Sequence, residues 1–441
     1  MFTRICLSLA LLLATPMWSQ AVPAASGGAP AENDDTQMQT PPPVSGEPYP
    51  TMVGSEARSN YLRGAMNVIS AYDDNVLTGT SDHPVGDVTY SILPTISLDQ
   101  TTRRFQQTLT YSPGFTFYER TSELDEVDQN AAANFQYRLR PHASISVRDT
   151  LQKSSSAFNQ PESAVTGSSQ VPPTTVFTPF GDRLRNELNA ELSYQISRNS
   201  MLGGGGSMTY LDYPDPSQVP GLYNSSSRGG GAFWSVRLSG TQYFGTAYQY
   251  SLSLANPLHA ESKTQTNSIS LFYTIYLKRT FSLSFLGGPQ HSAFAQSSLQ
   301  AQGSWTPSVT ASFGWQRSHT NFAASYTRIV TGGGGLLGAF ESNSANGLVR
   351  WKAARTWSVG ATASYANNKS VTPALFTSSP GGQSISGAVT FQRAISEHLG
   401  AECGYQHLHQ SYPGIPVLSS TPDSDRVYGS VSYQFTRPLG R

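Results

Sequence analysis

The stretch "SISLFYTIYLKRTFSLSFLGG", from Ser268 to Gly288, decides the fold. Every second residue from Ile269 to Leu277 is apolar, and the same spacing returns from Phe281 to Phe285. A period of two places alternate side chains on opposite faces of a β-strand. The polar segment Lys278-Arg279-Thr280 between the two arms predicts a short turn. We interpret the stretch as a hairpin with one apolar face and one polar face of Ser and Thr.

The same alternation recurs from about residue 61 to the chain end, for example over 184–196, 244–254 and 427–435. Strands of soluble domains usually run about five or six residues. A tilted strand that crosses a bilayer needs about nine to eleven, which fits these segments better. We therefore predict an all-β fold: a closed antiparallel transmembrane β-barrel with apolar side chains toward lipid and polar side chains toward the lumen.

Short polar turns alternate with longer Ser-, Pro-, Gly- and Asn-rich loops, which is the pattern of short periplasmic turns and long extracellular loops. Counting them predicts about 18 strands, with both chain ends in the periplasm. Sixteen strands are the alternative, because the first strand and 280–288 have the weakest patterns. The longest loop, 153–181, is long enough to fold inward as a plug, so an open and a plugged lumen both fit. The expected strands are 61–72, 87–99, 104–118, 129–140, 143–152, 182–197, 201–213, 228–238, 241–254, 266–277, 280–288, 303–317, 320–331, 343–353, 356–366, 383–393, 397–409 and 426–436.

The N-terminal region divides the chain into three parts. Residues 1–21 carry Arg4, an apolar core and a small-residue cleavage site, which predicts a secretory signal peptide. Residues 22–58 are rich in Pro, Ala, Gly and Ser, which predicts a disordered periplasmic leader. The barrel then occupies 59–441. Charged residues make up 13% and the formal net charge is zero, which argues against a nucleic-acid surface.

Aromatic residues gather beside the short turns, as expected of the girdle at a membrane interface. Tyr276 and Phe281 flank the turn Lys278-Arg279-Thr280 of the hairpin from Ser268 to Gly288. Phe435 ends the last strand, where the barrel-assembly machinery of outer membranes reads an aromatic residue. The expected girdle consists of Phe105, Tyr137, Tyr194, Phe244, Phe281, Trp315, Phe322, Trp351, Trp357, Phe391 and Phe435.

Charged residues on the polar parity are the candidates for solute selectivity, because charges lining a water-filled lumen set which solutes pass. Arginine outnumbers carboxylate among them, which favours anionic or polar solutes. The alternative is that these charges pair with one another and only keep the lumen polar. The candidates are Arg138, Arg148, Arg183, Arg185, Glu187, Glu191, Arg237, Arg350, Lys352 and Glu402.

Four other features have simpler interpretations. Asp73-Asp74 is a carboxylate pair that could activate water, but a solvated turn is the more economical interpretation. His407 and His409 share a strand face, without an identifiable third metal ligand. The acidic run from Glu123 to Asp128 is interpreted as a solvated loop tip. Glycine runs 203–206 and 332–335 lack a following Lys-Ser or Lys-Thr, so neither is a phosphate-binding loop. The first run suits a sharp bend or a neighbour that packs across the lumen, and the second a flexible loop.

The segments "SAYDDNVLTG" (70–79) and "VTYSILPTISLDQTTRRFQQTLTYSPGFTFY" (88–118) resemble the opening hairpins of the β-barrel porin-2 family. The matching residues are Tyr72, Asp73, Asn75, Pro94, Arg104 and Tyr111. The likeness is strongest over about the first sixty barrel residues. It implies an outer-membrane barrel, associated in some relatives with exopolysaccharide systems, and it carries over no catalytic residue.

The sequence thus predicts a porin-like channel for passive diffusion of hydrophilic, anionic or saccharide solutes in the outer membrane. The expected partners are outer-membrane lipid, lipopolysaccharide, the barrel-assembly machinery and the solutes, with no cofactor and no enzymatic activity. A non-conducting barrel that supports exopolysaccharide export or surface adhesion is the first alternative. An outer-membrane hydrolase is the second.

Overall fold

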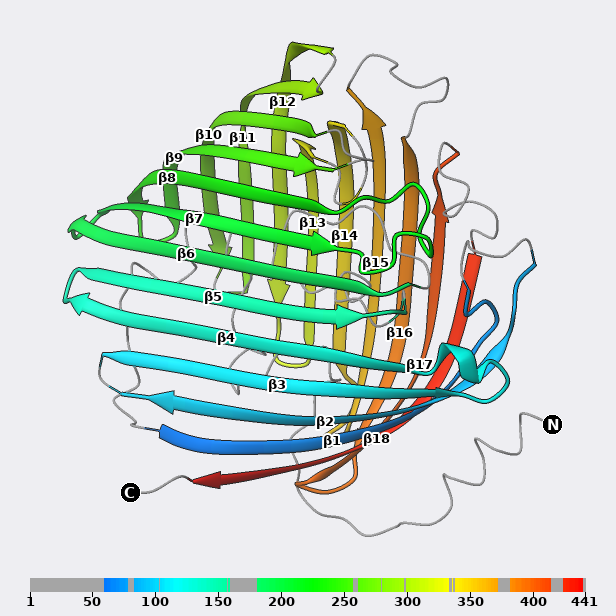
Figure 1. Cartoon of the computed structure of the whole chain (residues 1–441). Coiled ribbons are helices and arrows are strands. Elements are labelled where there is room, and N and C mark those ends of the chain that lie inside the picture. The colour runs from blue at the N-terminus through cyan, green and yellow to red at the C-terminus, as the bar shows by residue number, and fades with distance from the viewer. Residues whose placement is uncertain are drawn as a thin grey trace.

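The computed structural model describes residues 59–77, 83–102, 104–156, 158, 181–256, 261–278, 280–296, 299–332, 335, 338–371, 381–413 and 423–438. The described chain forms an eighteen-stranded antiparallel sheet that closes on itself (Figure 1). Each strand pairs with the next in sequence, and β1 pairs with β18 from Tyr61↔Pro438 to Asp73↔Arg426. The expected signal peptide (1–21) and leader (22–58) lie outside the described residues.

The strands are long, between 12 and 18 residues. Their bounds are β1 Ser59–Asp73, β2 Asp87–Thr101, β3 Phe105–Tyr118, β4 Glu126–Arg140, β5 Ala143–Ser154, β6 Arg183–Ser197, β7 Ser200–Asp212, β8 Ser225–Ser239, β9 Gln242–Ala255, β10 Ser262–Lys278, β11 Phe281–Gln296, β12 Leu299–Gln316, β13 Thr320–Thr331, β14 Phe340–Lys352, β15 Trp357–Ser370, β16 Gly382–Ala394, β17 Leu399–Ser411 and β18 Asp423–Pro438. A single 3₁₀ turn, η1 (Ser122–Leu124), joins β3 to β4 in the described chain. No helix in these ranges is long and apolar enough to cross a membrane.

The predicted count of eighteen strands is confirmed, and the alternative of sixteen is wrong. One expected loop is also wrong. The pattern places a long loop after residue 288, but β11 continues to Gln296 and β12 begins at Leu299. Gly287-Gly288-Pro289 interrupts the alternation in the sequence, which hides the second half of this hairpin. We call the end with the short turns and both terminal strand ends the short-turn end, and the opposite end the loop end.

Large apolar side chains are exposed on all eighteen strands, and on each strand they share one parity, apart from Tyr61 at the start of β1. On β10, Ile269 is 61% exposed and Leu271 55%, whereas the intervening Ser270 is 5% exposed. The expected girdle residues share this outward parity. A continuous apolar belt around a closed sheet far exceeds the patches found on soluble monomers. The belt therefore faces lipid, and the chain is a transmembrane barrel.

The inner face is mostly small and hydroxylated, as the parity predicts. Hydroxyls bond across neighbouring strands, for example Ser91 to Thr116 at 2.9 Å and Thr274 to Ser284 at 3.2 Å. Such pairs satisfy polar groups at the wall and add to strand pairing. A polar lining of this kind leaves the interior wettable.

One part of the inner face is apolar. Met201, Phe233, Tyr243, Ala247 and Phe272 form a buried cluster on β7 to β10. Gly203 and Gly245 lie beside the rings of Phe233 and Phe272, where an added Cβ would overlap the ring. The neighbour expected to pack across the lumen at the glycine run 203–206 is therefore wrong at Gly203, because the ring that fills the space comes from Phe233 on the adjacent strand β8.

Tyr276 belongs to this inner cluster and not to the girdle, so its expected place is wrong. It has the parity of Thr274, which faces the lumen, and its ring meets Tyr243 edge-on at 6.0 Å. Tyr276 was assigned to the girdle because it is close to a turn, but the parity of the strand determines whether a side chain faces lipid or lumen.

The pairing of β12 with β13 stops well short of the loop end. The β12–β13 ladder ends at Val309↔Arg328, although β12 continues for ten residues toward the loop end. Pro307 is opposite Pro289 of β11, and neither residue has a backbone N–H, so the two cannot form a hydrogen-bonded pair. In an antiparallel sheet, a residue that is not hydrogen-bonded on one side has its N and C=O directed toward the strand on the other side, which here is β13. Proline cannot donate to that ladder, which explains why the pairing stops there.

Candidate functional site

The lumen is the candidate site, and all ten predicted selectivity residues lie on its parity, opposite the exposed apolar side chains. Arg148, Glu191 and Lys352 are exposed to the interior space, whereas Arg183 and Arg185 are buried. Several of them are held by neighbours. Arg185 bonds Glu187 at 3.1 Å, and Arg148 donates to Asn134 at 2.8 Å.

The carboxylates of the lumen are more numerous than the sequence pattern suggested. Asp73, Asp87, Glu126 and Asp128 are buried on the inward parity of β1, β2 and β4, all near the loop end. Glu126 and Asp128 belong to β4, so the interpretation of the whole acidic run as a loop tip is wrong for them. Because β4 begins three residues earlier than the alternation indicates, these two side chains were assigned to the loop.

Charges of both signs line the same part of the lumen. The carboxylates above lie on β1, β2 and β4, and β6 carries Glu187 and Glu191 beside Arg183 and Arg185. Near the short-turn end, Arg63 pairs with Asp99 at 2.8 Å, and near the loop end the Asp73 carboxylate faces Arg426 on β18.

An apolar cluster lies inside the loop end, and we call it the mouth cluster. It consists of Leu211, Tyr213, Val219, Leu222, Phe340 and Tyr412. These residues come from the end of β7, the loop 213–224, the start of β14 and the residue after β17. In the closed ring, β14 is seven strand positions from β7, and β17 is eight. Contacts between such distant parts of the wall must be made across the lumen.

Hydrogen bonds fix the segments that make the mouth cluster. Asn224 accepts from the backbone N–H of Tyr213 at 2.8 Å and closes the base of the 213–224 loop. Tyr223 donates its backbone N–H to Gly335, which has φ +99°. Asn368 on β15 donates to the Tyr412 hydroxyl at 2.7 Å. At the loop surface, Ser217 donates its hydroxyl and backbone N–H to Asp215, which lowers the pKa of that carboxyl.

The end of β13 also turns into the lumen. Gln290 of β11 exchanges two hydrogen bonds of 2.9 Å with the backbone of Val330. Gly332 follows, against Ser253 of β9 and Thr264 of β10. The chain thus leaves β12 at Arg328 and passes along the inner face of three earlier strands. The expectation of a plain flexible loop at 332–335 is wrong for the described Gly332 and Gly335, which are packed against the wall and the mouth cluster.

The loop 153–181, which the sequence leaves either clear of the lumen or folded into it, is described at Phe158. This ring packs against the buried Leu408 of β17, and Arg426 of β18 stacks over it at 5.5 Å. Strand β17 is six ring positions from β5, where the loop starts. The loop is therefore turned into the lumen at this residue.

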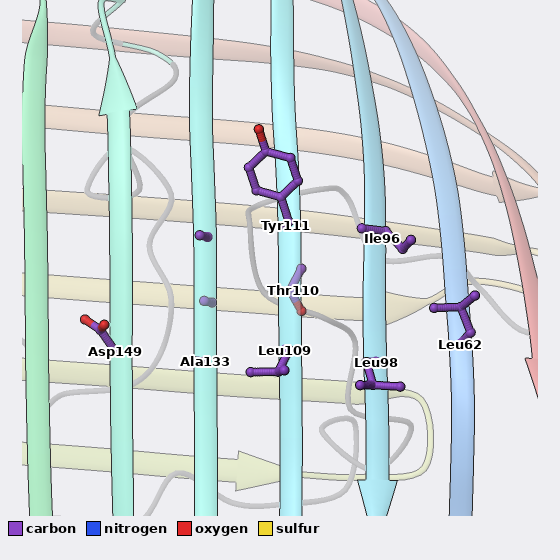
Figure 2. Close-up of a pocket in the computed structure, with 10 residues that line it drawn as sticks. Leu62, Ile96, Leu98, Leu109, Thr110, Tyr111, Ala133 and Asp149 are labelled. Carbon is purple, nitrogen blue, oxygen red and sulfur yellow. The ribbon is translucent and has the colours of Figure 1, made fainter. Parts of the chain in front are cut away.

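The cavity of about 380 Å³ shown in Figure 2 is not part of the lumen. It is a groove on the outer face, with Ala131 and Ala133 of β4 as its floor. Leu109 and Tyr111 rise on one side and Asp149 on the other (Figure 2). Asn186 donates to Asp149 at 2.8 Å, which satisfies this carboxylate within the wall. This groove lies in the apolar belt, on the opposite face of the wall from the lumen.

The acidic residue Asp73 and the histidine His407, which were considered for chemistry, lie on opposite faces of the wall. Asp73 turns inward and accepts from Ser424 and from the backbone N–H of Asn75, while His407 is on the outward parity. Asp74 accepts from the backbone N–H of Asp425. The Asp73-Asp74 pair is therefore engaged in closing β1 against β18. No group of three or more His, Cys, Asp or Glu in the described ranges is arranged around a metal position.

No protein-family model and no curated protein matches the chain. Among solved structures it is similar to OccAB4 of Acinetobacter baumannii, at 7% identity and TM-score 0.45, over 86% of this chain and 98% of that one. It is also similar to the outer membrane protein OpdK of Pseudomonas aeruginosa, at 10% identity and TM-score 0.42, over 85% and 99%. OccK2 (OpdF) of Pseudomonas aeruginosa, in complex with glucuronate, has 12% identity and TM-score 0.43, over 85% and 98%. The likeness is one of barrel architecture alone.

Proposed function

We propose that this protein is an outer-membrane channel for passive diffusion of small hydrophilic solutes. The observation that carries the proposal is the closed ring of eighteen strands, apolar outside and polar inside, with charged side chains directed into the lumen. A wall of this size encloses a space much wider than its own side chains fill. The signal peptide expected at residues 1–21 supports export to the outer membrane, with lipid and lipopolysaccharide around the belt and the assembly machinery as a transient partner.

The mouth cluster makes the channel selective by size. Apolar contacts across the lumen narrow the loop end, whereas no comparable crossing is made by the described residues of the short-turn end. Solutes therefore meet the constriction first when they enter from outside. The ten predicted lumen charges, together with the carboxylates on β1 to β4, then act on charged solutes. Anion preference is weaker than the arginine count predicts, because these carboxylates oppose it.

Liposome swelling with the refolded full-length protein tests the proposal. Neutral sugars of increasing size should enter at rates that fall steeply with size, because the mouth cluster narrows the lumen. Sugar acids and amino sugars of equal size compare the two signs of charge. Swelling no faster than in protein-free liposomes, for the smallest sugar, would contradict a channel. It would favour the alternative of a non-conducting barrel that supports exopolysaccharide export or adhesion.

A further inference from the structure

Two Asp–His pairs lie side by side on the outer face of β17 and β18, at the loop end. His407 is directly opposite Asp425, and His409 is directly opposite Asp423. In each pair the imidazole Nδ1 is 2.8 Å from a carboxylate oxygen. The two pairs follow one another along the strands, two residues apart, so the two imidazoles are on the same face.

The imidazoles face outward, away from the lumen. They share the parity of Tyr405 on β17, which is 44% exposed. The side chains of His407 and His409 are 36% and 25% exposed. The partly exposed polar side chains of His407, His409, Asp423 and Asp425 lie at the loop end of both strands, where we place the rim of the apolar belt. The rim site is therefore accessible without passage through the channel.

The aspartates determine which ring nitrogen is free. An ionised carboxylate only accepts hydrogen bonds, so the proton of each neutral imidazole is on Nδ1. Nε2 then carries the lone pair. Metal-binding histidines show this arrangement, in which a carboxylate holds one ring nitrogen and the metal binds the other. Tyr405 donates to Asp425 as well, which fixes the carboxylate that orients His407.

The spacing allows both imidazoles to bind one ion. Residues two apart on a strand are about 6.5 to 7 Å apart. A metal with nitrogen ligands at about 2.0–2.1 Å spans about 4 Å between them when they are opposite each other. Each ring therefore has to move toward the other by about 1.5 Å along the strand. Gly387 is opposite His407 on β16 and leaves space on that side for the movement.

We propose that His407 and His409 form a surface site for one divalent transition-metal ion, with water completing its coordination. Imidazole nitrogen suits Cu²⁺, Ni²⁺ and Zn²⁺, whereas Mg²⁺ and Ca²⁺ prefer oxygen ligands. Affinity follows the order that places Cu²⁺ above Ni²⁺ and Zn²⁺. The site is independent of the channel function, because it lies on the opposite face of the wall from the lumen.

Titration of the untagged full-length protein in detergent with Cu²⁺ tests the proposal, after treatment with a chelator. Electron paramagnetic resonance should show one Cu²⁺ per barrel with two nitrogen ligands. The double variant H407Q/H409Q should lose this signal, and each single variant should retain one nitrogen at weaker affinity. Asp423→Asn should weaken binding about 10- to 100-fold, as loss of an orienting carboxylate does elsewhere.

The control variant is His319→Gln, which removes a histidine at the short-turn end and should leave binding unchanged. A difference in electrophoretic mobility between unheated and heated samples verifies that each variant still forms the barrel. Mg²⁺ in excess should not displace Cu²⁺. The proposal is overturned if folded H407Q/H409Q binds Cu²⁺ as the wild type does, or if Mg²⁺ competes with equal strength.

Discussion

The membrane-crossing wall and the loop end of this barrel are built by different kinds of contact. In the wall, each strand contacts the strand that follows it in the sequence, and alternation of side chains fixes the face. At the loop end, the mouth cluster joins residues that are seven or eight strand positions apart. The wall therefore determines stability, and the loop end determines access to the lumen.

The strongest test of the wall is a charge placed in the apolar belt. Leu271→Arg should lower the free energy of unfolding by about 2–4 kcal/mol if the residue lies near the bilayer midplane. Ser146→Arg is the matched control, because Ser146 is exposed on the inward parity of β5. Denaturant titration in lipid vesicles measures both. Equal losses in the two variants would contradict the assignment of the faces.

A smaller loss of unfolding free energy than for Leu271→Arg is expected at Gly288, where two strands approach closely. An added Cβ at Gly288 would overlap the carbonyl oxygen of Ile269, at the point where the β10–β11 pairing is interrupted. Gly288→Ala should therefore cost about 1–3 kcal/mol, in the range of overpacked sites. Gly287→Ala is the control, since its Cβ would lie 3.5 Å from Ser308. The same vesicle titration should show the control near wild type.

Substitutions in the mouth cluster should change conductance more than stability, unlike those in the wall. Phe340 is fully buried there, but its partners are loop segments and strand ends. Phe340→Ala should change the stability of the whole barrel by less than about 1 kcal/mol, because such segments open locally. Its single-channel conductance should rise. Phe340→Leu keeps most of the apolar volume and should conduct as the wild type does.

The smallest effect is expected from one lumen charge. Arg148 is exposed to the interior, so Arg148→Glu should shift the reversal potential under a salt gradient toward cations. Lys369→Glu, on the outward parity of β15, makes the same charge change outside the lumen. A shift of equal size in both variants would show that surface charge, and not the lining, sets the selectivity.

Much of the wall could be predicted from the sequence. All eighteen strands, the face of the apolar belt and the inward parity of the ten charged residues follow from a period of two. The extension of β11 was missed, because Gly287-Gly288-Pro289 breaks the alternation. Glu126 and Asp128 were assigned to a loop for a similar reason, since the first residues of β4 are acidic and not apolar.

The loop end could not be predicted in the same way. Leu211 and Phe340 are apolar on the inward parity, where the alternation predicts polar side chains, and the contacts of the mouth cluster join segments more than a hundred residues apart. Pro307 gave one usable signal, because a proline within a strand pattern indicates the end of a ladder. The inward course of residues 330–332 depends on that interruption.

Single-channel conductance in planar bilayers tests the channel and its constriction most directly, for the wild type and for a variant with residues 214–223 replaced by a short Gly-Ser linker. We expect stable conductance for the wild type and a several-fold larger value for the variant, since the mouth cluster loses Val219 and Leu222. Equal conductance in both would contradict the constriction at the loop end. No conductance in either, from protein that is folded, would contradict the channel itself.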